Sequence, residues 1–251
     1  IRQNKFTQTE LIQSTQEVKN AYPDTVPLAG LEHRNLHKET AALLSPQKSE
    51  RSGEETQVET LPFCHLHTHT QFSVLQSTIS ISKLVQEAVS MNMPAVAITD
   101  IGNLMGAFHF VKAVNKHNKS LEEGMGNPIK PIIGITLNVC ANHLDRSHRD
   151  DGFQIVLIAK NKNGYHNLAK LTSIAHTKGF YYVPRVDRDL ILNYKEDIIV
   201  LTGNVYGEVP YKVLNIGAQQ AEDSLLWWQE HFGSDLYIEL MRHNQEDETR
   251  V

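Results

Sequence analysis

From residue 61 onwards, short apolar segments alternate with amphipathic ones, and this alternation constrains the fold more than any other feature of the sequence. Periodicity predicts strands at residues 63–68, 95–99, 129–140, 153–159, 198–202 and 236–241, and helices at residues 79–91, 104–117, 165–176 and 218–232. Alternating strands and helices favour parallel strands with the helices outside the sheet. The number of units and the absence of a Gly-rich dinucleotide-binding motif favour a barrel-like α/β fold over an open sheet.

Residues 1–60 have a different character. The segment SPQKSERSGEETQVET at residues 45–60 is charged and poor in apolar side chains, which is typical of a flexible tether. Residues 7–20 are compatible with a short helix. We therefore expect a partly helical or flexible linker over residues 1–60 and a folded domain over residues 61–251. The chain starts without an initiating Met and stops within a charged stretch, so we expect it to be a piece of a longer protein.

The composition argues against several classes of protein. The net charge is −5 and the sequence shows no basic concentration, so strong nucleic-acid binding by this chain alone is not expected. Cys64 and Cys140 are the only cysteines, which argues against a disulfide framework and fits a reducing cytosol. No apolar run is long enough to cross a bilayer and no signal peptide opens the chain, so we expect a cytoplasmic protein.

The sequence HLHTHT at residues 65–70 is the first candidate for chemistry. Alternate residues of a strand face the same side, so His65, His67 and His69 are predicted to present three imidazoles to one surface. Imidazole is the commonest metal-coordinating side chain. The alternative for a short motif of this kind is a polar strand with solvated histidines.

Two more polar side chains, Asp100 and His243, each follow a predicted strand. In βα barrels the site lies at the carboxyl ends of the strands, where His67 and His69 are also expected. Two histidines and a carboxylate would form the beginning of a zinc or manganese site. Alternatively, Asp100 is a turn or helix-capping residue and His243 is a surface histidine.

Several longer segments carry a resemblance to a known family. They are, in order, HLHTHTQFSVL, AVAITDIGNLMGAFHF, KPIIGITLNV, FQIVLIAKNKNGYHNLAKL, TKGFYYVPRVDRDLI and YIELMRHN. Together they resemble the PHP (polymerase and histidinol phosphatase) domain of the bacterial DNA polymerase III α subunit over residues 61–251. The segments KNKNGYHNL and GFYYVPRVD are similar to the polymerase version rather than to free-standing PHP phosphatases. The resemblance implies a distorted, TIM-like (β/α)7 barrel, truncated here at its C-terminal end, whose complete site holds several metal ions and hydrolyses phosphoesters.

The same resemblance implies a depleted metal site. His67 and His69 match the first motif of the family, Asp100 matches the Thr-Asp-His motif, and His243 is the fourth residual candidate. Weak or non-coordinating side chains occupy other ligand positions of the family, at Gln76, Ile101, Thr136, Gln154 and Asn204. The final Asp-x-His motif would lie beyond the last residue. Losing charged ligands also removes the negative field that holds several ions together, so we expect one weakly bound zinc or manganese ion, or none.

Three functions compete on these grounds. The first is a structural and interaction domain within a replicative DNA-directed DNA polymerase, whose Mg²⁺-dependent nucleotidyl transfer lies in other domains. Its expected partners are those domains and a proofreading exonuclease module. If that module is fused upstream, residues 1–60 would tether it to the PHP domain. DNA would be contacted through the parent protein. The second is an active metal-dependent 3′→5′ exonuclease or phosphoesterase. The third is a free-standing phosphatase acting on a small molecule.

Overall fold

The computed structural model describes residues 9–12, 63–121 and 126–251. The chain divides into two units, one made of Ile1–Thr15 with Pro62–Val251 and the other of Gln16–Leu61. Only the first unit contains described residues, so the linker predicted over residues 1–60 lies almost entirely outside them. The exception is the strand β1 (Thr9–Ile12), which forms where a short helix was expected.

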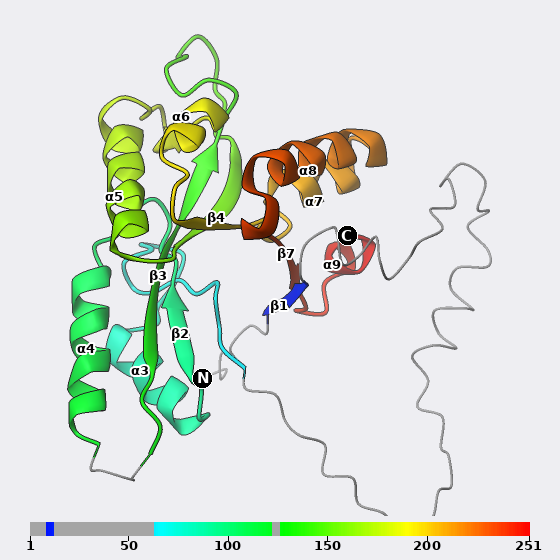
Figure 1. The fold of residues 1–251 in the computed structure, drawn as a ribbon. Coiled ribbons are helices and arrows are strands. Elements are labelled where there is room, and N and C mark those ends of the chain that lie inside the picture. The colour runs from blue at the N-terminus through cyan, green and yellow to red at the C-terminus, as the bar shows by residue number, and fades with distance from the viewer. Residues whose placement is uncertain (1–8, 13–62, 122–125) are drawn as a thin grey trace, which may run out of the picture. The chain divides into compact units, whose positions relative to one another are not determined.

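A mixed seven-stranded sheet curls into a half-barrel at the centre of the first unit (Figure 1). The strand order is β1-β7-β6-β4-β3-β2, and β5 pairs with β3. Besides β1, the strands are β2 (Ala95–Ile98), β3 (Lys130–Val139), β4 (Phe153–Ala159), β5 (Arg185–Val186), β6 (Ile198–Leu201) and β7 (Leu236–Met241). The predicted strands from residue 95 onwards are confirmed, whereas β1 and β5 were not predicted.

Strand β4 runs against both strands beside it. The pairs β2–β3 and β6–β7 are parallel, but β4 is antiparallel to β3 and to β6. The expectation of parallel strands throughout is therefore wrong at β4. The reason lies in residues 140–152, which connect β3 to β4 and contain no helix. Parallel neighbours need a long, usually helical, crossover, whereas a chain that turns back directly forms an antiparallel pair.

Helices cover the sheet on its outer side (Figure 1). They are α3 (Ile81–Ser90), α4 (Ala107–Lys119), α5 (Lys162–Thr177), α6 (Arg188–Asn193), α7 (Glu208–Asn215), α8 (Ala218–Phe232), the short 3₁₀ helix η1 (Gly233–Asp235) and α9 (Glu246–Arg250). The four predicted helices are confirmed as α3, α4, α5 and α8. The predicted apolar face of α3 is buried, at Ile81, Leu84, Val85 and Ala88. No described helix combines the length and the apolar character needed to span a lipid bilayer.

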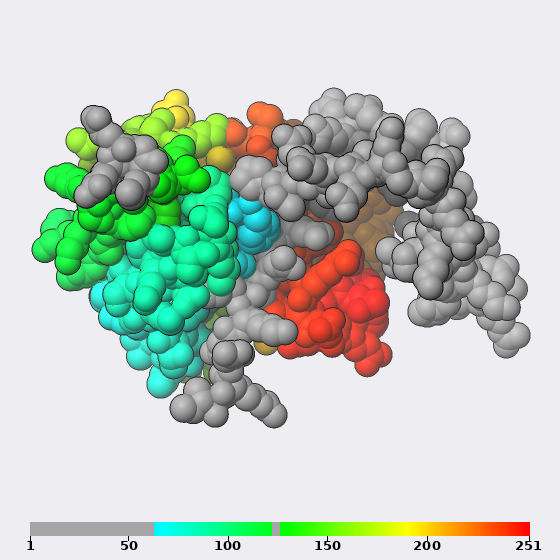
Figure 2. All heavy atoms as spheres, turned by 90° about the horizontal axis from the view of Figure 1, so that it is seen from below, coloured from blue at the N-terminus to red at the C-terminus, as the bar shows by residue number. Residues whose placement is uncertain are grey.

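Three apolar clusters are present among the described residues, and the two largest hold most of the elements in place. In the larger cluster, Leu137 of β3 and Leu157 of β4 pack with Trp228 of α8. The second cluster joins α3 and α4 to β2, with Val96 and Phe110 fully buried. The view from below shows α3 in teal and the C-terminal residues in red (Figure 2). Because β2 is buried along its whole length, it holds the residues at its carboxyl end rigidly in place.

Candidate metal site

Residues 63–70 reach the site as an extended segment beside β2. Ala97 N donates a hydrogen bond to His65 O at 2.9 Å, and Thr99 N donates to Thr68 O at 2.8 Å. The chain bends between these two contacts. The regular strand predicted here is therefore replaced by an irregular segment that still extends the sheet beyond β2.

Two of the three histidines in this segment meet. His67 Nε2 and His69 Nε2 are 3.2 Å apart, and their ring centroids are 5.0 Å apart. His67 is buried and His69 is half-buried. His65 is also buried, and its ring packs edge-on against Phe63 with 5.0 Å between centroids. The bend thus replaces the predicted even row of imidazoles by one close pair, His67 and His69.

Thr136 of β3 lies against both rings of this pair. Its Oγ1 is 3.3 Å from His69 Nε2 and 3.4 Å from His67 Nε2. The hydroxyl donates its hydrogen to Thr99 O at 2.9 Å. Because that hydrogen is already used, Oγ1 turns only lone pairs towards the histidines. The position where the resemblance expects a glutamate is therefore part of the site, as a neutral oxygen.

Glu239 of β7 belongs to the same site and was not predicted. Its Oε1 accepts a hydrogen bond from His67 Nδ1 at 2.8 Å, with the two side chains 0% and 2% exposed. The backbone N of Glu239 donates to Thr202 Oγ1 at 3.0 Å. Among the described residues, Glu239 Oε2 is the one buried side-chain oxygen or nitrogen without a hydrogen-bond partner. The available signal was a charged residue inside the predicted strand at residues 236–241.

The hydrogen bond to Glu239 sets the tautomer of His67. With a hydrogen on Nδ1, the neutral ring directs the lone pair of Nε2 towards His69. Burial and, to a lesser extent, the neighbouring His67 lower the pKa of His69 to about 4. His69 is therefore uncharged near neutral pH and keeps a lone pair that a ligand can use.

Asp100 follows β2, as predicted, but its carboxylate is bound to the loop after the histidines. Oδ1 accepts hydrogen bonds from Thr70 N at 2.6 Å and Ser73 Oγ at 2.7 Å, and Oδ2 accepts from Thr70 Oγ1 at 2.8 Å. The side chain is buried, whereas Gln76 in the same loop is exposed. These contacts tie the loop at residues 70–73 to the end of β2, and none of the three is made within the turn that follows Asp100.

Three other predicted positions, His243, Gln154 and Asn204, have other contacts in the structure. His243 lies in the exposed loop after β7, where its ring and its backbone N both contact the carboxylate of Glu248. Gln154 N donates to Tyr206 O at 3.0 Å, and Asn204 Oδ1 accepts from Tyr206 N at 2.9 Å. These two positions therefore share a neighbour.

Ile101 lies beside Thr136, the residue that contacts both histidines of the pair. It forms an isolated parallel bridge with Thr136, and Thr136 N donates to Asp100 O at 3.1 Å. The apolar side chain offers no lone pair to a metal ion. Ile101, one of the ligand positions expected from the resemblance, therefore cannot coordinate a metal ion.

The residues present fit one metal ion and not several. In the described part of the chain, no three His, Cys, Asp or Glu side chains gather as a metal-binding group. The converging donor atoms are His67 Nε2, His69 Nε2 and Thr136 Oγ1, which are 3.2–3.4 Å from one another. Nitrogen ligands about 2.0–2.1 Å from a tetrahedral zinc ion lie about 3.3 Å apart, so the triangle has the size of one face of such a site. A multi-ion hydrolytic centre needs further carboxylates.

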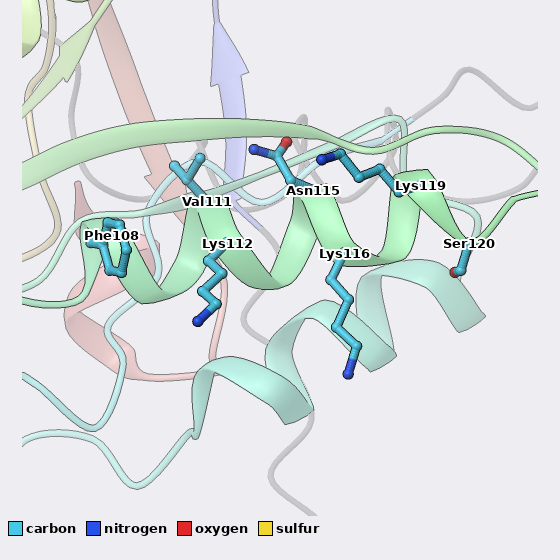
Figure 3. A pocket seen from close by; sticks show the side chains of 7 residues that line it. All are labelled: Phe108, Val111, Lys112, Asn115, Lys116, Lys119 and Ser120. Atoms are coloured by element: carbon cyan, nitrogen blue, oxygen red, sulfur yellow. The ribbon is translucent and has the colours of Figure 1, made fainter.

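One hollow in the surface lies on the outer side of α4 (Figure 3). It has a volume of about 560 Å³ and is lined by Phe108, Val111, Lys112, Asn115, Lys116, Lys119 and Ser120. The side chains of Lys112 and Lys116 extend away from the helix there. None of the predicted metal-site residues lines this hollow, so it gives no support to a substrate pocket at the histidines.

Comparison with known families identifies the domain that carries this site. The sequence profile of the PHP domain matches residues 65–243, a range that includes His67, His69, Thr136 and Glu239. The chain belongs to the PHP domain family. The resemblance expected from the sequence is thereby confirmed.

The PHP domain is homologous to the PHP region of DNA polymerase III α subunits. It is 37% identical over 193 residues to the α subunit of Borreliella burgdorferi, covering 75% of this chain and 16% of the relative. It is 38% identical over 187 residues to the α subunit of Chlamydia trachomatis, covering 73% of this chain and 14% of the relative. The chain therefore spans about one sixth of the length of these relatives. A solved amidohydrolase from Chromobacterium violaceum is 13% identical, with a TM-score of 0.29 over 45% of this chain and 32% of that one.

Proposed function

We propose that this PHP domain is part of a DNA polymerase III α subunit and serves there as a structural and interaction domain. The similarity to curated α subunits supports the identity of the parent. Mg²⁺-dependent DNA synthesis would then belong to other parts of the parent. The observation that carries the non-catalytic role is Thr136, a buried neutral hydroxyl that contacts both histidines where the resemblance expects a glutamate.

The charge of the site argues against hydrolysis. Metal-assisted phosphoester hydrolysis commonly uses two ions about 3.5–4 Å apart, and negatively charged ligands help to offset the repulsion between them. Asp100 is engaged with Thr70 and Ser73, and Glu239 is engaged with His67. His67 and His69 would thus hold one zinc or manganese ion weakly, or none. When bound, such an ion would supply a Lewis acid, without the second ion that a two-ion hydrolytic centre uses.

The proposed partners are the remaining domains of the polymerase and a proofreading exonuclease module, with DNA contacted through the parent. The complete domain is proposed to form the distorted (β/α)7 barrel of the family. Two contacts support closure: residues 63–70 pair with β2, and His67 in that segment bonds to Glu239 of β7. The segment therefore links strands that are far apart in the order of the sheet.

The second candidate function is an active metal-dependent 3′→5′ exonuclease or phosphoesterase. One observation favours it: the free, buried oxygen of Glu239 lies on the side chain that binds His67. A carboxylate with an unused oxygen next to a histidine pair is a group that a catalytic ion could recruit.

Both candidates are tested with one assay. The purified chain is incubated with Mn²⁺ or Zn²⁺ and either a 5′-labelled single-stranded oligonucleotide or bis(4-nitrophenyl) phosphate. We expect no product beyond that of a His69→Ala variant whose fold is checked by circular dichroism, which serves as the matched background. Product formation that depends on His69 would establish the exonuclease or phosphoesterase function instead.

A further inference from the structure

We propose that Glu239 is a positioning residue for a single divalent-cation site on His67 and His69. In this arrangement, Glu239 orients the imidazole of His67 through Nδ1 and supplies negative charge to the bound cation. The inference rests on the proposed function only in that this function allows one weakly held ion. It assigns a role to a residue of β7 that lies 172 positions from its partner in the sequence.

The burial of Glu239 requires a compensating charge. Its side chain is fully buried, and among the described residues its one hydrogen bond from another side chain comes from His67. No Lys or Arg among the described residues forms an ion pair with it. A buried carboxylate without a nearby positive charge is costly, so the missing charge belongs on or beyond the ring of His67.

The atoms beyond that ring are three that could bind a cation. Thr136 Oγ1 has given its hydrogen to Thr99 O, and His67 Nε2 carries a lone pair because Nδ1 donates to Glu239. His69 Nε2 completes the triangle; without a metal ion it carries the hydrogen that it donates to His67 Nε2, and a cation would displace this hydrogen. Only one positive centre fits among these atoms. A divalent cation there would satisfy all three and would give Glu239 its counter-charge through the ring of His67.

Two of the three other histidine–carboxylate pairs in the described residues show how the environment of Glu239 differs. In the pair His143–Asp187, the carboxylate also accepts hydrogen bonds from backbone N–H groups, one of them at the start of α6. In the pair His243–Glu248, the carboxylate likewise accepts from backbone N–H groups. Those carboxylates have local structural roles. From the described part of the chain, the carboxylate of Glu239 receives no such hydrogen bond, and Oε2 is left without a partner.

The test compares Zn²⁺ affinity by isothermal titration calorimetry in the purified chain and its variants. Glu239→Gln keeps the shape of the side chain and an oxygen that accepts from Nδ1, but it removes the charge. We expect its Zn²⁺ affinity to fall about 10- to 100-fold, the usual cost of losing a carboxylate behind a ligating histidine. Glu248→Gln is the matched control, because it also removes a carboxylate from a histidine Nδ1, and its affinity should equal that of the wild type.

A second readout separates positioning from a purely structural role. The visible absorption of bound Co²⁺ reports the ligands and geometry of the ion. We expect the spectrum to change in Glu239→Gln and to be unchanged in Glu248→Gln. Circular dichroism without metal checks that each variant folds. If Glu239→Gln does not fold, Glu239→Asp carries the test, because it keeps the charge but moves it away from Nδ1 and should also weaken binding.

The outcomes are distinct. Equal Zn²⁺ affinity in the wild type and in Glu239→Gln would overturn the positioning role. Absence of Zn²⁺ binding by the wild type would overturn the cation site and leave the structural role of the domain intact. Retention of several ions with histidine-dependent phosphoester hydrolysis would overturn the proposed function, whereas the role of Glu239 would still be decided by its own variant.

Discussion

His67 Nδ1 donates to Glu239 Oε1 at 2.8 Å and thereby joins the segment beside β2 to the distant strand β7. Both side chains are almost completely buried. A buried polar pair is most sensitive to the loss of one partner, since the other then stays in an apolar environment without compensation.

Replacing His67 alone should therefore destabilise the domain more than replacing both partners. We expect His67→Ala to lower the free energy of unfolding by about 3–5 kcal/mol in metal-free buffer. The double variant His67→Leu/Glu239→Leu should lose less, because no buried charge remains. Urea unfolding of both variants measures the difference. A double variant that is less stable than His67→Ala would contradict this account of the pair.

Restoring a carboxylate at Thr136 should raise the affinity of the site for metal. Thr136→Glu adds volume and charge at a buried position, so without metal we expect a lower Tm. Added Zn²⁺ should raise the Tm of this variant by more than it raises that of the wild type, because tighter binding to the folded state stabilises it. Thermal unfolding with and without Zn²⁺ measures both effects. Thr136→Val is the control and should show no gain.

Arg185 should be the main anchor of residues 140–152. It is 1% exposed, and its guanidinium donates to Gly179 O at 3.1 Å, Asp150 O at 2.9 Å and Asp145 O at 2.8 Å. We expect Arg185→Ala to cost about 3 kcal/mol and to make this loop sensitive to protease. Arg185→Lys should rescue little, because an ammonium cannot reproduce the planar fork. Limited proteolysis with mass spectrometry locates the cleavage; unchanged resistance of the loop would contradict the assignment.

Glu208 should make the domain sensitive to acid. Its carboxylate accepts hydrogen bonds from Arg188 at 2.7 Å, Lys212 at 2.8 Å and Trp228 Nε1 at 3.1 Å. Burial by itself would raise the pKa of Glu208, but the hydrogen bonds from Arg188 and Lys212 outweigh it, and the pKa lies below its usual value. The ionised form is therefore favoured by folding. Its stabilising contribution is complete above the usual glutamate pKa of about 4.3 and is lost as the pH falls through the lower, folded value.

The measurement for Glu208 is urea unfolding across the acid range. We expect Glu208→Gln to be less stable than the wild type by about 2–3 kcal/mol near neutral pH. The difference should shrink as the pH falls from about 5 towards 3, because the wild type loses its ionised carboxylate over that range. Glu87→Gln, at the exposed pair with Lys83, is the control. A stability difference that is independent of pH would rule out this role of the Glu208 charge.

Local pattern was sufficient for most of the elements. The apolar spacing in residues 79–91 predicts α3 because a helix face is a property of neighbouring residues, and the buried run of β2 could be recognised for the same reason. The position of Asp100 at the end of β2 followed directly from that strand. These features depend on short-range periodicity, which is visible without knowing how the chain folds back on itself.

Features that depend on tertiary contacts could not be predicted in this way. The direction of β4 depends on whether residues 140–152 form a crossover helix, and the bend before His67 breaks the alternation that placed three histidines on one face. Glu239 reaches His67 across 172 positions, so no window of sequence contains both. Its isolated charge within an apolar strand marked it as unusual but did not identify its partner.

The reversed direction of β4 has a practical consequence for labelling the domain. Val139 at the end of β3 pairs with Phe153 at the start of β4, so residues 140–152 turn over at the carboxyl end of β3. The tip of this turn, around Ser147, is exposed. Exposed tips of connections tolerate inserted residues well. A fluorophore attached at Ser147 would therefore sit on the turn between β3 and β4 while the register of the strands stays unchanged.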